Sequence, residues 1–252
     1  MNHIKIYFSL FLLCVFAHQS TVAQTAPRPA IMLDIHNLVG QVSGDMAKRY
    51  SGHFGIGGGL SYQPIKNHFQ FGAKFSYFYG RTVKEDVMAP FRTATDGLLI
   101  GEDRFLAEMR LRERGFNAQL YTGGIFPFPE RATFRHGIKW QLGVGFLQHK
   151  IRMQDEAKAL RQFTTDVLKG LDRMCNGYSI VPFLGYEYLS YNGRINFYFG
   201  LEPVIGFTGS RRTWNYDTNT TDFGVKRLDM LWNVKVGWYL PFFIERADQV
   251  DY

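Results

Sequence analysis

Residues near the C-terminal end of the chain alternate between two kinds of side chain. In Trp232–Leu240 the even-numbered positions carry Trp, Val, Val, Trp and Leu, whereas the odd-numbered positions carry Asn, Lys, Gly and Tyr. Successive side chains of a β-strand point to opposite faces, so this segment predicts a strand with one apolar and one more polar face. The alternation therefore favours a β-sheet protein.

The same alternation recurs along the chain. The strong segments are Phe69–Tyr79, Ile138–Phe146 and Ile195–Phe207, and the weaker ones are Phe54–Tyr62, Phe116–Ile125, Tyr178–Tyr188 and Ile31–Leu38. Aromatic residues make up 16% of the chain, and aromatic residues favour strands. Together the segments predict eight strands, an even number of the kind that is usual for a barrel in a bacterial outer membrane.

The connections between these segments alternate between short and long. The short ones are Gln63–Asn67, Pro127–His136 and Asn192–Gly193, and the long ones are about 40–52, 81–114, 152–177 and 210–227. Transmembrane barrels show this asymmetry, with short periplasmic turns and longer external loops. The sequence therefore predicts an all-β, eight-stranded antiparallel up-and-down transmembrane barrel over residues 24–252, with both chain ends on the side of the short turns.

The first 23 residues have the features of an export signal. Lys5 precedes an apolar run over 6–17 that is too short to span a bilayer, and small side chains up to Ala23 suit cleavage. We therefore expect 1–23 to be a cleaved signal peptide. Beyond it the chain has no apolar run of about 18 residues, so helical membrane spans are not expected.

Two of the long loops show patterns of their own. In 154–171 the apolar residues follow helical spacing, which predicts a short amphipathic helix outside the barrel. In Arg104–Arg112 the alternation resumes, with Phe105, Ala107, Met109 and Leu111 on one face, so the fourth strand is expected to protrude above the membrane. Pairing of this segment with Leu98–Ile100 would raise the strand count to ten, and the sequence leaves that alternative open.

The polar face of the strands carries a balanced set of charges. Its acids and bases are Asp34, Lys74, Lys139, Glu187, Glu202 and Lys235. The interior of an eight-stranded barrel is just wide enough for side chains to fill it, and charges there are costly unless they are paired. These residues are therefore predicted to form a closed polar network in the lumen, with glycines on the same face leaving room for them.

Basic residues gather where the strands should leave the outer leaflet. They are Arg81, Lys84, Lys150, Arg152, Arg211, Arg212, Lys226 and Arg227. Lipid A phosphates lie at that level and Arg and Lys bind phosphate well, so these residues are candidate contacts to lipopolysaccharide. An ordinary set of solvated loop charges is an equally good interpretation. The net charge is +7, but 81–114 carries about as many acids as bases, so nucleic acid is not an expected partner.

The chain carries no convincing catalytic or cofactor motif. Gly55–Gly59 is rich in glycine, but a strand and Pro64 follow it instead of the helix that a nucleotide-binding loop needs. The histidines lack metal-ligand spacing, and no spacing singles out a nucleophile with a base beside it. After the signal only Cys175 remains, which is expected to be a small loop side chain. We therefore expect no enzyme, no cofactor and no metal.

The mature chain resembles the small outer-membrane β-barrel proteins of the Bacteroidota and, more loosely, OmpA-type transmembrane barrels. The resemblance lies in the signal ending Val22-Ala23-Gln24 and in the terminal stretch Val236–Phe242. It implies residence in the outer membrane of a Gram-negative bacterium, with membrane lipid, lipopolysaccharide and other outer-membrane proteins as partners. The acidic tail Glu245–Tyr252 departs from the usual barrel ending, and the resemblance transfers no functional residue.

The leading functional expectation is a structural or interaction protein, in which a closed barrel presents external loops. The alternative is an accessory subunit of an outer-membrane secretion or assembly complex, similar to a type IX secretion component. A narrow pore and a lipid A-modifying enzyme follow. A continuous lumen would favour the pore, and a His–Ser pair at the membrane rim would favour the enzyme.

Overall fold

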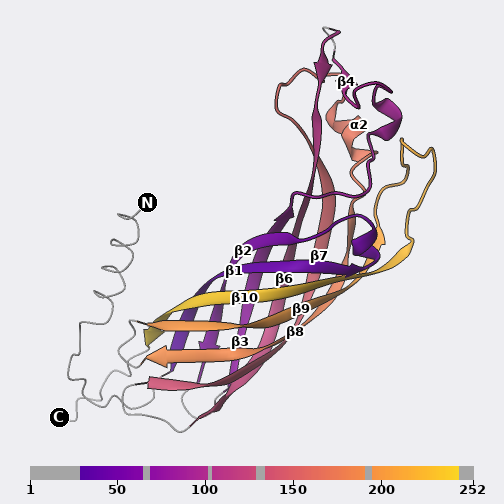
Figure 1. The fold of residues 1–252 in the computed structure, drawn as a ribbon. Coiled ribbons are helices and arrows are strands. Elements are labelled where there is room, and N and C mark those ends of the chain that lie inside the picture. The colour runs from indigo at the N-terminus through magenta and orange to yellow at the C-terminus, as the bar shows by residue number, and fades with distance from the viewer. Residues whose placement is uncertain (1–28, 65–68, 102–103, 129–133, 191–194, 244–252) are drawn as a thin grey trace, which may run out of the picture.

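The computed structural model describes residues 29–64, 69–101, 104–128, 134–190 and 195–243. Eight strands form a closed antiparallel barrel in the order β1-β10-β9-β8-β7-β6-β3-β2, which confirms the predicted fold (Figure 1). The barrel strands are β1 (Ala30–Gly44), β2 (His53–Gln63), β3 (Phe69–Gly80), β6 (Met109–Pro127), β7 (Phe134–Asp155), β8 (Cys175–Ser190), β9 (Asn196–Ser210) and β10 (Lys226–Phe243). Pairing of β1 with β10 closes the ring. The expected signal peptide and the acidic tail lie outside the described residues.

The register turns the apolar side chains outward, as the alternation predicted. On β10, Val234 and Val236 are 49% and 54% exposed, whereas Asn233 and Lys235 are 3% exposed or less. The same holds on β3, where Phe71 and Phe75 face outward and Lys74 is buried. Because side chains alternate along every strand, one register fixes the face of the whole segment.

The outward-facing side chains form a continuous apolar belt around the barrel. It includes Ile35, Val39, Ile56, Leu60, Phe71, Phe75, Leu120, Leu142, Val144, Leu184, Phe199, Leu201, Val234 and Val236, all more than a third exposed. Its upper edge lies just above Phe116 on β6 and Phe146 on β7, where Arg114 and Lys150 take over the outer face. A tall apolar band on the outside of a barrel is the pattern of lipid-facing strands.

Among the described residues, no helix combines the length and the apolar character that crossing a membrane demands.

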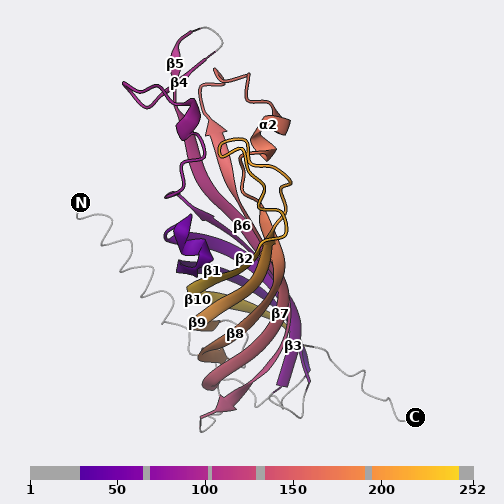
Figure 2. The same cartoon turned by 90° about the vertical axis from the view of Figure 1, so that its right-hand side faces the viewer.

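Strands β6 and β7 continue well above the belt and support the external loops (Figure 2). They remain paired up to Met109 and Asp155, so the predicted protrusion of the fourth strand is confirmed. Residues Leu99–Ile100 (β4) and Leu106–Ala107 (β5) pair with each other in a separate two-stranded sheet. The pairing that would have raised the strand count therefore exists, but it lies outside the barrel, which keeps eight strands.

The helix predicted over 154–171 is much shorter in the structure. Helix α2 covers only Thr165–Lys169, and the first two residues of the predicted segment belong to β7. The apolar residues that produced the helical spacing serve another purpose, because Leu160 and Leu171 are buried beneath the loops. The alternation predicted in Arg104–Arg112 also fails at its start, since Phe105 is 75% exposed while Ala107 and Met109 are buried.

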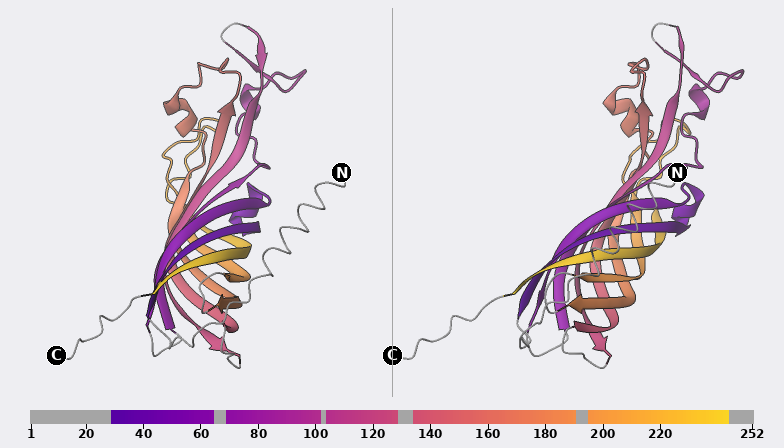
Figure 3. Two further views of the ribbon diagram at one scale, coloured as in Figure 1. Left: turned by 90° about the vertical axis from the view of Figure 1, so that its left-hand side faces the viewer. Right: turned by 60° about the vertical axis from the view of Figure 1, so that its left-hand side comes forward.

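The external loops form one packed body with the top of the barrel, which we call the external cap. Its apolar core includes Met46 from the short 3-10 helix η1 (Asp45–Lys48), and Met88, which precedes the 3-10 helix η2 (Ala89–Phe91). These residues belong to the same cluster as Leu147 and Leu231 inside the barrel. Figure 3 shows the cap rising above one side of the barrel, with β4, β5 and α2 near its top. The cap therefore shares a hydrophobic core with the barrel.

Candidate functional site

Paired charges fill the lower half of the lumen. Lys74 Nζ lies 3.3 Å from Asp34 Oδ2, and Lys235 Nζ lies 2.9 and 2.7 Å from the two carboxylate oxygens of Glu202. A third ion pair joins Lys139 to Glu187. The structure thus brings the six predicted lumen residues together as three pairs, and each of the six is 3% exposed or less.

Neutral side chains complete the hydrogen bonding around Asp34. The hydroxyl of Tyr198 donates to both of its carboxylate oxygens at 3.0 and 2.8 Å, and His36 Nδ1 lies 3.0 Å from Oδ1. The other ring nitrogen of His36 lies 2.8 Å from the hydroxyl of Ser76. A buried carboxylate with this many partners is far less costly than an isolated one. The alternation identifies the inward face of these residues, but it does not reveal their contacts.

Sequence analysis missed Arg135 as a member of the network. Its guanidinium donates to Glu187 at 3.2 Å and to Gln63 at 3.1 Å, so Glu187 receives two cations. The predicted strand began at Ile138, whereas β7 begins at Phe134. Extending the alternation back by two steps would have placed Arg135 on the inner face with Lys139.

Aromatic rings pack between the charges at the turn end of the lumen. Tyr198 stacks on Tyr239 with ring centroids 4.9 Å apart, and Phe183 meets Tyr198 edge-on at 5.6 Å. A Cβ at position 237 would collide with the Tyr198 ring, so glycine is needed there. Gly237 therefore provides the room for long lumen side chains that the sequence led us to expect.

An apolar layer crosses the lumen above the charged network. Its members are Leu38, Phe78, Leu147, Val204 and Leu231, each 3% exposed or less. The cavity beside them measures about 10 Å³, which is at the lower limit for a single water molecule. The predicted polar network therefore does not extend to this level, because inward-facing positions on five strands carry aliphatic or aromatic side chains.

A second polar group lies above this layer, beneath the external cap. His149 Nε2 lies 2.8 Å from Asp229 Oδ2, the oxygen that also accepts a hydrogen bond from Thr208. Burial lowers the pKa of His149, although Asp229 acts in the opposite direction. The ring of Tyr50 meets His149 edge-on at 5.5 Å. These side chains join the cap to the barrel interior.

Glu113, in the same region, is buried without a hydrogen-bond partner among the described residues. Its side chain is fully buried, and within the described part of the chain neither carboxyl oxygen has a hydrogen-bond partner. It lies above the belt, between the outward-facing Arg112 and Arg114. Burial raises the pKa of Glu113 to about 8, and the charge of Arg114 offsets this only in part. The carboxyl group is therefore largely protonated at neutral pH.

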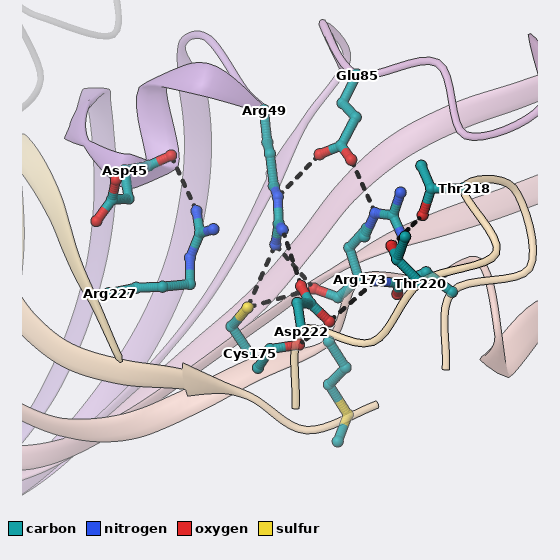
Figure 4. Close-up of polar contacts among 12 residues, drawn as sticks. Asp45, Arg49, Glu85, Arg173, Cys175, Thr218, Thr220, Asp222 and Arg227 are labelled. Atoms are coloured by element: carbon teal, nitrogen blue, oxygen red, sulfur yellow. Dashed lines mark hydrogen bonds and ion pairs between the residues drawn. The ribbon is translucent and has the colours of Figure 1, made fainter. Parts of the chain in front are cut away.

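Two buried arginines tie all four external loops together (Figure 4). Arg49 lies 2.8 Å from Glu85 and 3.6 Å from Asp222, and it donates to the sulfur of Cys175 at 3.3 Å. Arg173 lies 2.8 Å from the same Glu85. Cys175, expected in a loop, is instead the buried first residue of β8. These contacts link loops that are far apart in sequence, so no local pattern predicts them.

The structure brings together only three of the eight basic residues proposed to contact lipopolysaccharide. Lys150, Arg152 and Arg212 line one cleft on the outer face of β6 and β7. The other five lie elsewhere. Three of them donate hydrogen bonds within the loops: Lys84 to Ala47, Arg211 to Asn176 and Arg227 to Asp45. The remaining two, Arg81 and Lys226, are exposed. Arg114 and Lys169 also line the cleft and were missed.

No group of His, Cys, Asp or Glu side chains in the described ranges could hold a metal ion.

Comparison with known proteins identifies no family. No protein-family model matches the chain, and no curated protein has a significantly similar sequence.

Several solved structures are similar in part. Neisserial surface protein A has a TM-score of 0.40 at 8% identity, covering 84% of this chain and 99% of the other. Ail of Yersinia pestis, solved with the heparin analogue sucrose octasulfate, has a TM-score of 0.38 at 11% identity over the same shares. The outer membrane protein OprG of Pseudomonas aeruginosa has a TM-score of 0.30 at 9% identity, covering 89% of this chain and all of the other (100%). Similarity at this level transfers no role to this chain.

Proposed function

We propose that this chain is an integral β-barrel protein of a bacterial outer membrane, exported by its N-terminal signal and closed to ions, whose external cap contacts other molecules. The observation that carries the proposal is the apolar belt around a barrel whose lumen is filled by buried side chains. An exposed apolar surface of this size would cause aggregation in water, whereas lipid is its natural solvent. The resemblance of the two chain ends favours an origin in the Bacteroidota.

Two barriers in series support a closed lumen. The lower barrier consists of the three ion pairs with their tyrosine and histidine partners, and the upper one is the apolar layer at Leu38 and Phe78. An ion would have to break buried pairs and then cross a dehydrated layer, which is unfavourable in both steps. A narrow pore is therefore a weaker interpretation than a closed barrel.

The arrangement of the histidines favours a role without catalysis. The pairs His36–Asp34 and His149–Asp229 resemble the orienting part of a catalytic triad, but all four side chains are 1% exposed or less. A general base must come within hydrogen-bond reach of a substrate, and these groups are enclosed by the barrel wall and the cap. We therefore propose that the protein binds no cofactor and acts through contacts.

The tip of the external cap offers a surface for such contacts. Ile100, Phe105 and Leu106 in and beside the β4–β5 hairpin are 56%, 75% and 48% exposed. Figure 3 shows this hairpin at the end of the cap farthest from the barrel. Large apolar side chains presented together on a rigid support are typical of protein-binding surfaces. We propose another outer-membrane or cell-surface protein as the partner, and no nucleic acid.

If the apolar belt lies in lipid, a charged side chain at position 236 should destabilise the barrel. Val236→Arg should lower the free energy of unfolding by about 2–4 kcal/mol in lipid vesicles, because its side chain faces outward in the middle of β10. Equilibrium urea unfolding of the reconstituted protein measures this. Val236→Met is the control for shape, and it should cost less than about 1.5 kcal/mol. Equal stability of the arginine and methionine variants would contradict immersion of this face in lipid.

The cap proposal predicts where protein partners attach. A photoreactive phenylalanine analogue at Phe105 should form covalent adducts with another protein when intact cells are irradiated. The same analogue at Phe223, which is 59% exposed on a lower loop of the cap, is the matched control. Electrophoresis followed by mass spectrometry identifies the adducts. The tip would not be the contact surface if the two positions gave equal amounts of protein adduct.

A further inference from the structure

Two successive outward-facing rungs of the β6–β7 ladder, on either side of the inward-facing Glu113–Ile151 rung, place like charges directly opposite each other. Arg114 pairs with Lys150, and Arg112 pairs with Arg152. All four lie at outward-facing positions just above the apolar belt, where Phe116 and Phe146 end it. Like charges at directly opposite positions of a sheet are destabilising. Four cations on these two rungs therefore need a compensating negative charge.

The described part of the chain does not supply that charge. Other cations nearby have carboxylate partners: Arg110 pairs with Glu108 and Glu156, and Arg212 pairs with Asp172 at 2.6 Å. None of the four cations on the two rungs has a described carboxylate within 4 Å. Arg114 instead donates to a backbone oxygen at 3.0 Å and lies over the ring of Tyr79. Their positive charge is therefore free to attract an anion.

Three of these four cations line a preformed cleft of about 390 Å³, and Arg112 lies outside it. One wall of this cationic cleft is the β6–β7 ladder with Arg114, Lys150 and Arg152. The other is the segment around α2, whose charges are paired: Lys169 lies 2.9 Å from Asp166, and Asp172 pairs with Arg212. Tyr77 and Phe116 line the side that faces the belt. Arginine and lysine together bind phosphate strongly, since arginine donates two hydrogen bonds from a planar fork. The cleft thus suits a phosphate group whose attached body is apolar.

An apolar groove of about 960 Å³ begins directly beneath the cleft. It exists because small residues interrupt the belt: Ala118 on β6 lies between Phe75 on β3 and Phe146 on β7. Gly58 and Ala73 continue the depression across β2 and β3. Phe116 joins the two sites, since its ring stacks on Phe75 with centroids 5.7 Å apart. Cleft and groove therefore form one surface with a cationic top and an apolar lower part.

We infer that this face of β3, β6 and β7 binds one phosphorylated glycolipid of the lipid A type, with its phosphates in the cationic cleft and an acyl chain in the apolar groove. The inference rests on the proposed function, because only a barrel in a membrane meets such a lipid at this level. Several uncompensated cations match a headgroup with more than one negative charge better than a singly charged phospholipid. The neighbouring apolar groove excludes free phosphate as the intended ligand.

Native mass spectrometry of the folded protein in detergent micelles tests the inference. The probes are diphosphoryl lipid A, the same lipid after removal of its phosphates, dioleoylphosphatidylglycerol and inorganic phosphate. The variant Arg114→Gln/Lys150→Gln removes two of the cations, and Lys48→Gln/Lys158→Gln removes two exposed cations elsewhere on the molecule. The wild type and the control should retain diphosphoryl lipid A. The affinity of the cleft variant for this lipid should be lower by a factor of about ten or more.

Two further measurements separate binding from folding. Without lipid, the cleft variant should unfold at a higher temperature than the wild type, because the repulsion between Arg114 and Lys150 is gone. Ala118→Phe fills the apolar groove without changing charge, and it should also weaken retention of the lipid. Equal retention by the wild type and the cleft variant, or equal retention of the phosphorylated and dephosphorylated lipids, would overturn the inference. Retention of phosphatidylglycerol or inorganic phosphate as strong as that of lipid A would do so too.

Insertion into phosphatidylcholine vesicles distinguishes this inference from the proposed function. A barrel that inserts but fails to retain phosphorylated lipid overturns only the lipid site. A wild-type chain that folds but does not insert would overturn the proposed function itself.

Discussion

Glu113→Gln should raise the free energy of unfolding at pH 8 by about 4 kcal/mol relative to the wild type. The effect should shrink steadily as the pH is lowered and should be small near pH 5. This result is expected because Glu113 is fully buried, with no described hydrogen-bond partner for either carboxyl oxygen. Few single substitutions that remove a charge are expected to stabilise a protein by so much.

The sign follows from the shifted pKa of Glu113. Burial raises the pKa to about 8 in the folded protein, compared with 4.5 for the ordinary group. Between these values the folded state holds a proton that the unfolded state has lost, so the stability of the wild type falls as the pH rises. The fall amounts to roughly 1.4 kcal/mol per pH unit and ends above the folded pKa. Glutamine cannot ionise and removes this dependence.

Equilibrium urea unfolding in phospholipid vesicles from pH 5 to pH 9 measures the effect. Burial also shifts the pKa of His149, so the informative quantity is the difference in stability between variant and wild type, in which the contribution of His149 cancels. Glu108→Gln removes a half-exposed carboxylate from the same segment and is the control for net charge. Parallel stability curves for Glu113→Gln and the wild type would show that the carboxyl group is not desolvated as described.

The fold could be predicted from the sequence because one physical rule governs most of it. In a barrel wall between lipid and a filled lumen, each strand must alternate apolar outward-facing side chains with more polar inward-facing ones. Segments such as Trp232–Leu240 follow this alternation at every position. The same rule identified the inward face of Lys235 and Glu202. It also predicted that the inward acids pair with the inward bases, but the geometry of the Lys235–Glu202 contact depends on how β9 and β10 are aligned.

The cationic cleft could not be predicted for a related reason. The alternation predicted that the fourth strand protrudes, and Arg112 and Arg114 do alternate outward on β6 opposite β7. Above the membrane edge the outward positions become polar, and the sequence alone does not show which cations of β7 lie opposite them. The contact of Arg49 with Glu85 in the cap depends on packing between distant loops, for which no local signal exists.

Glu202→Ala should lower the free energy of unfolding by about 3–5 kcal/mol, because it leaves Lys235 buried without its carboxylate. Both carboxylate oxygens of Glu202 lie within 2.9 Å of Lys235 Nζ, and neither side chain is more than 2% exposed. Lys235→Met in the otherwise unchanged protein should cost a similar amount, since it leaves the carboxylate alone.

The double variant Glu202→Leu/Lys235→Met distinguishes the contribution of the ion pair from the contribution of side-chain packing. Replacing a buried ion pair by apolar residues of similar volume is often neutral, so the double variant should recover most of the stability lost by either single variant. Urea unfolding of the wild type, Glu202→Leu, Lys235→Met and the double variant in vesicles closes the double-mutant cycle. Losses that simply add would mean that the two charges do not interact in the folded barrel.

Conductance provides an independent test of the same network. Planar-bilayer recordings should show little current for the wild type, because the ion pairs and the apolar layer at Leu38 and Phe78 block the lumen in series. Glu202→Ala should also conduct little, since it disturbs the lower barrier and leaves the upper one in place. Combining Glu202→Ala with Phe78→Ala weakens both barriers and should produce measurable current. Large, stable conductance in the wild type would mean that the side chains do not close the lumen and that the pore interpretation is correct.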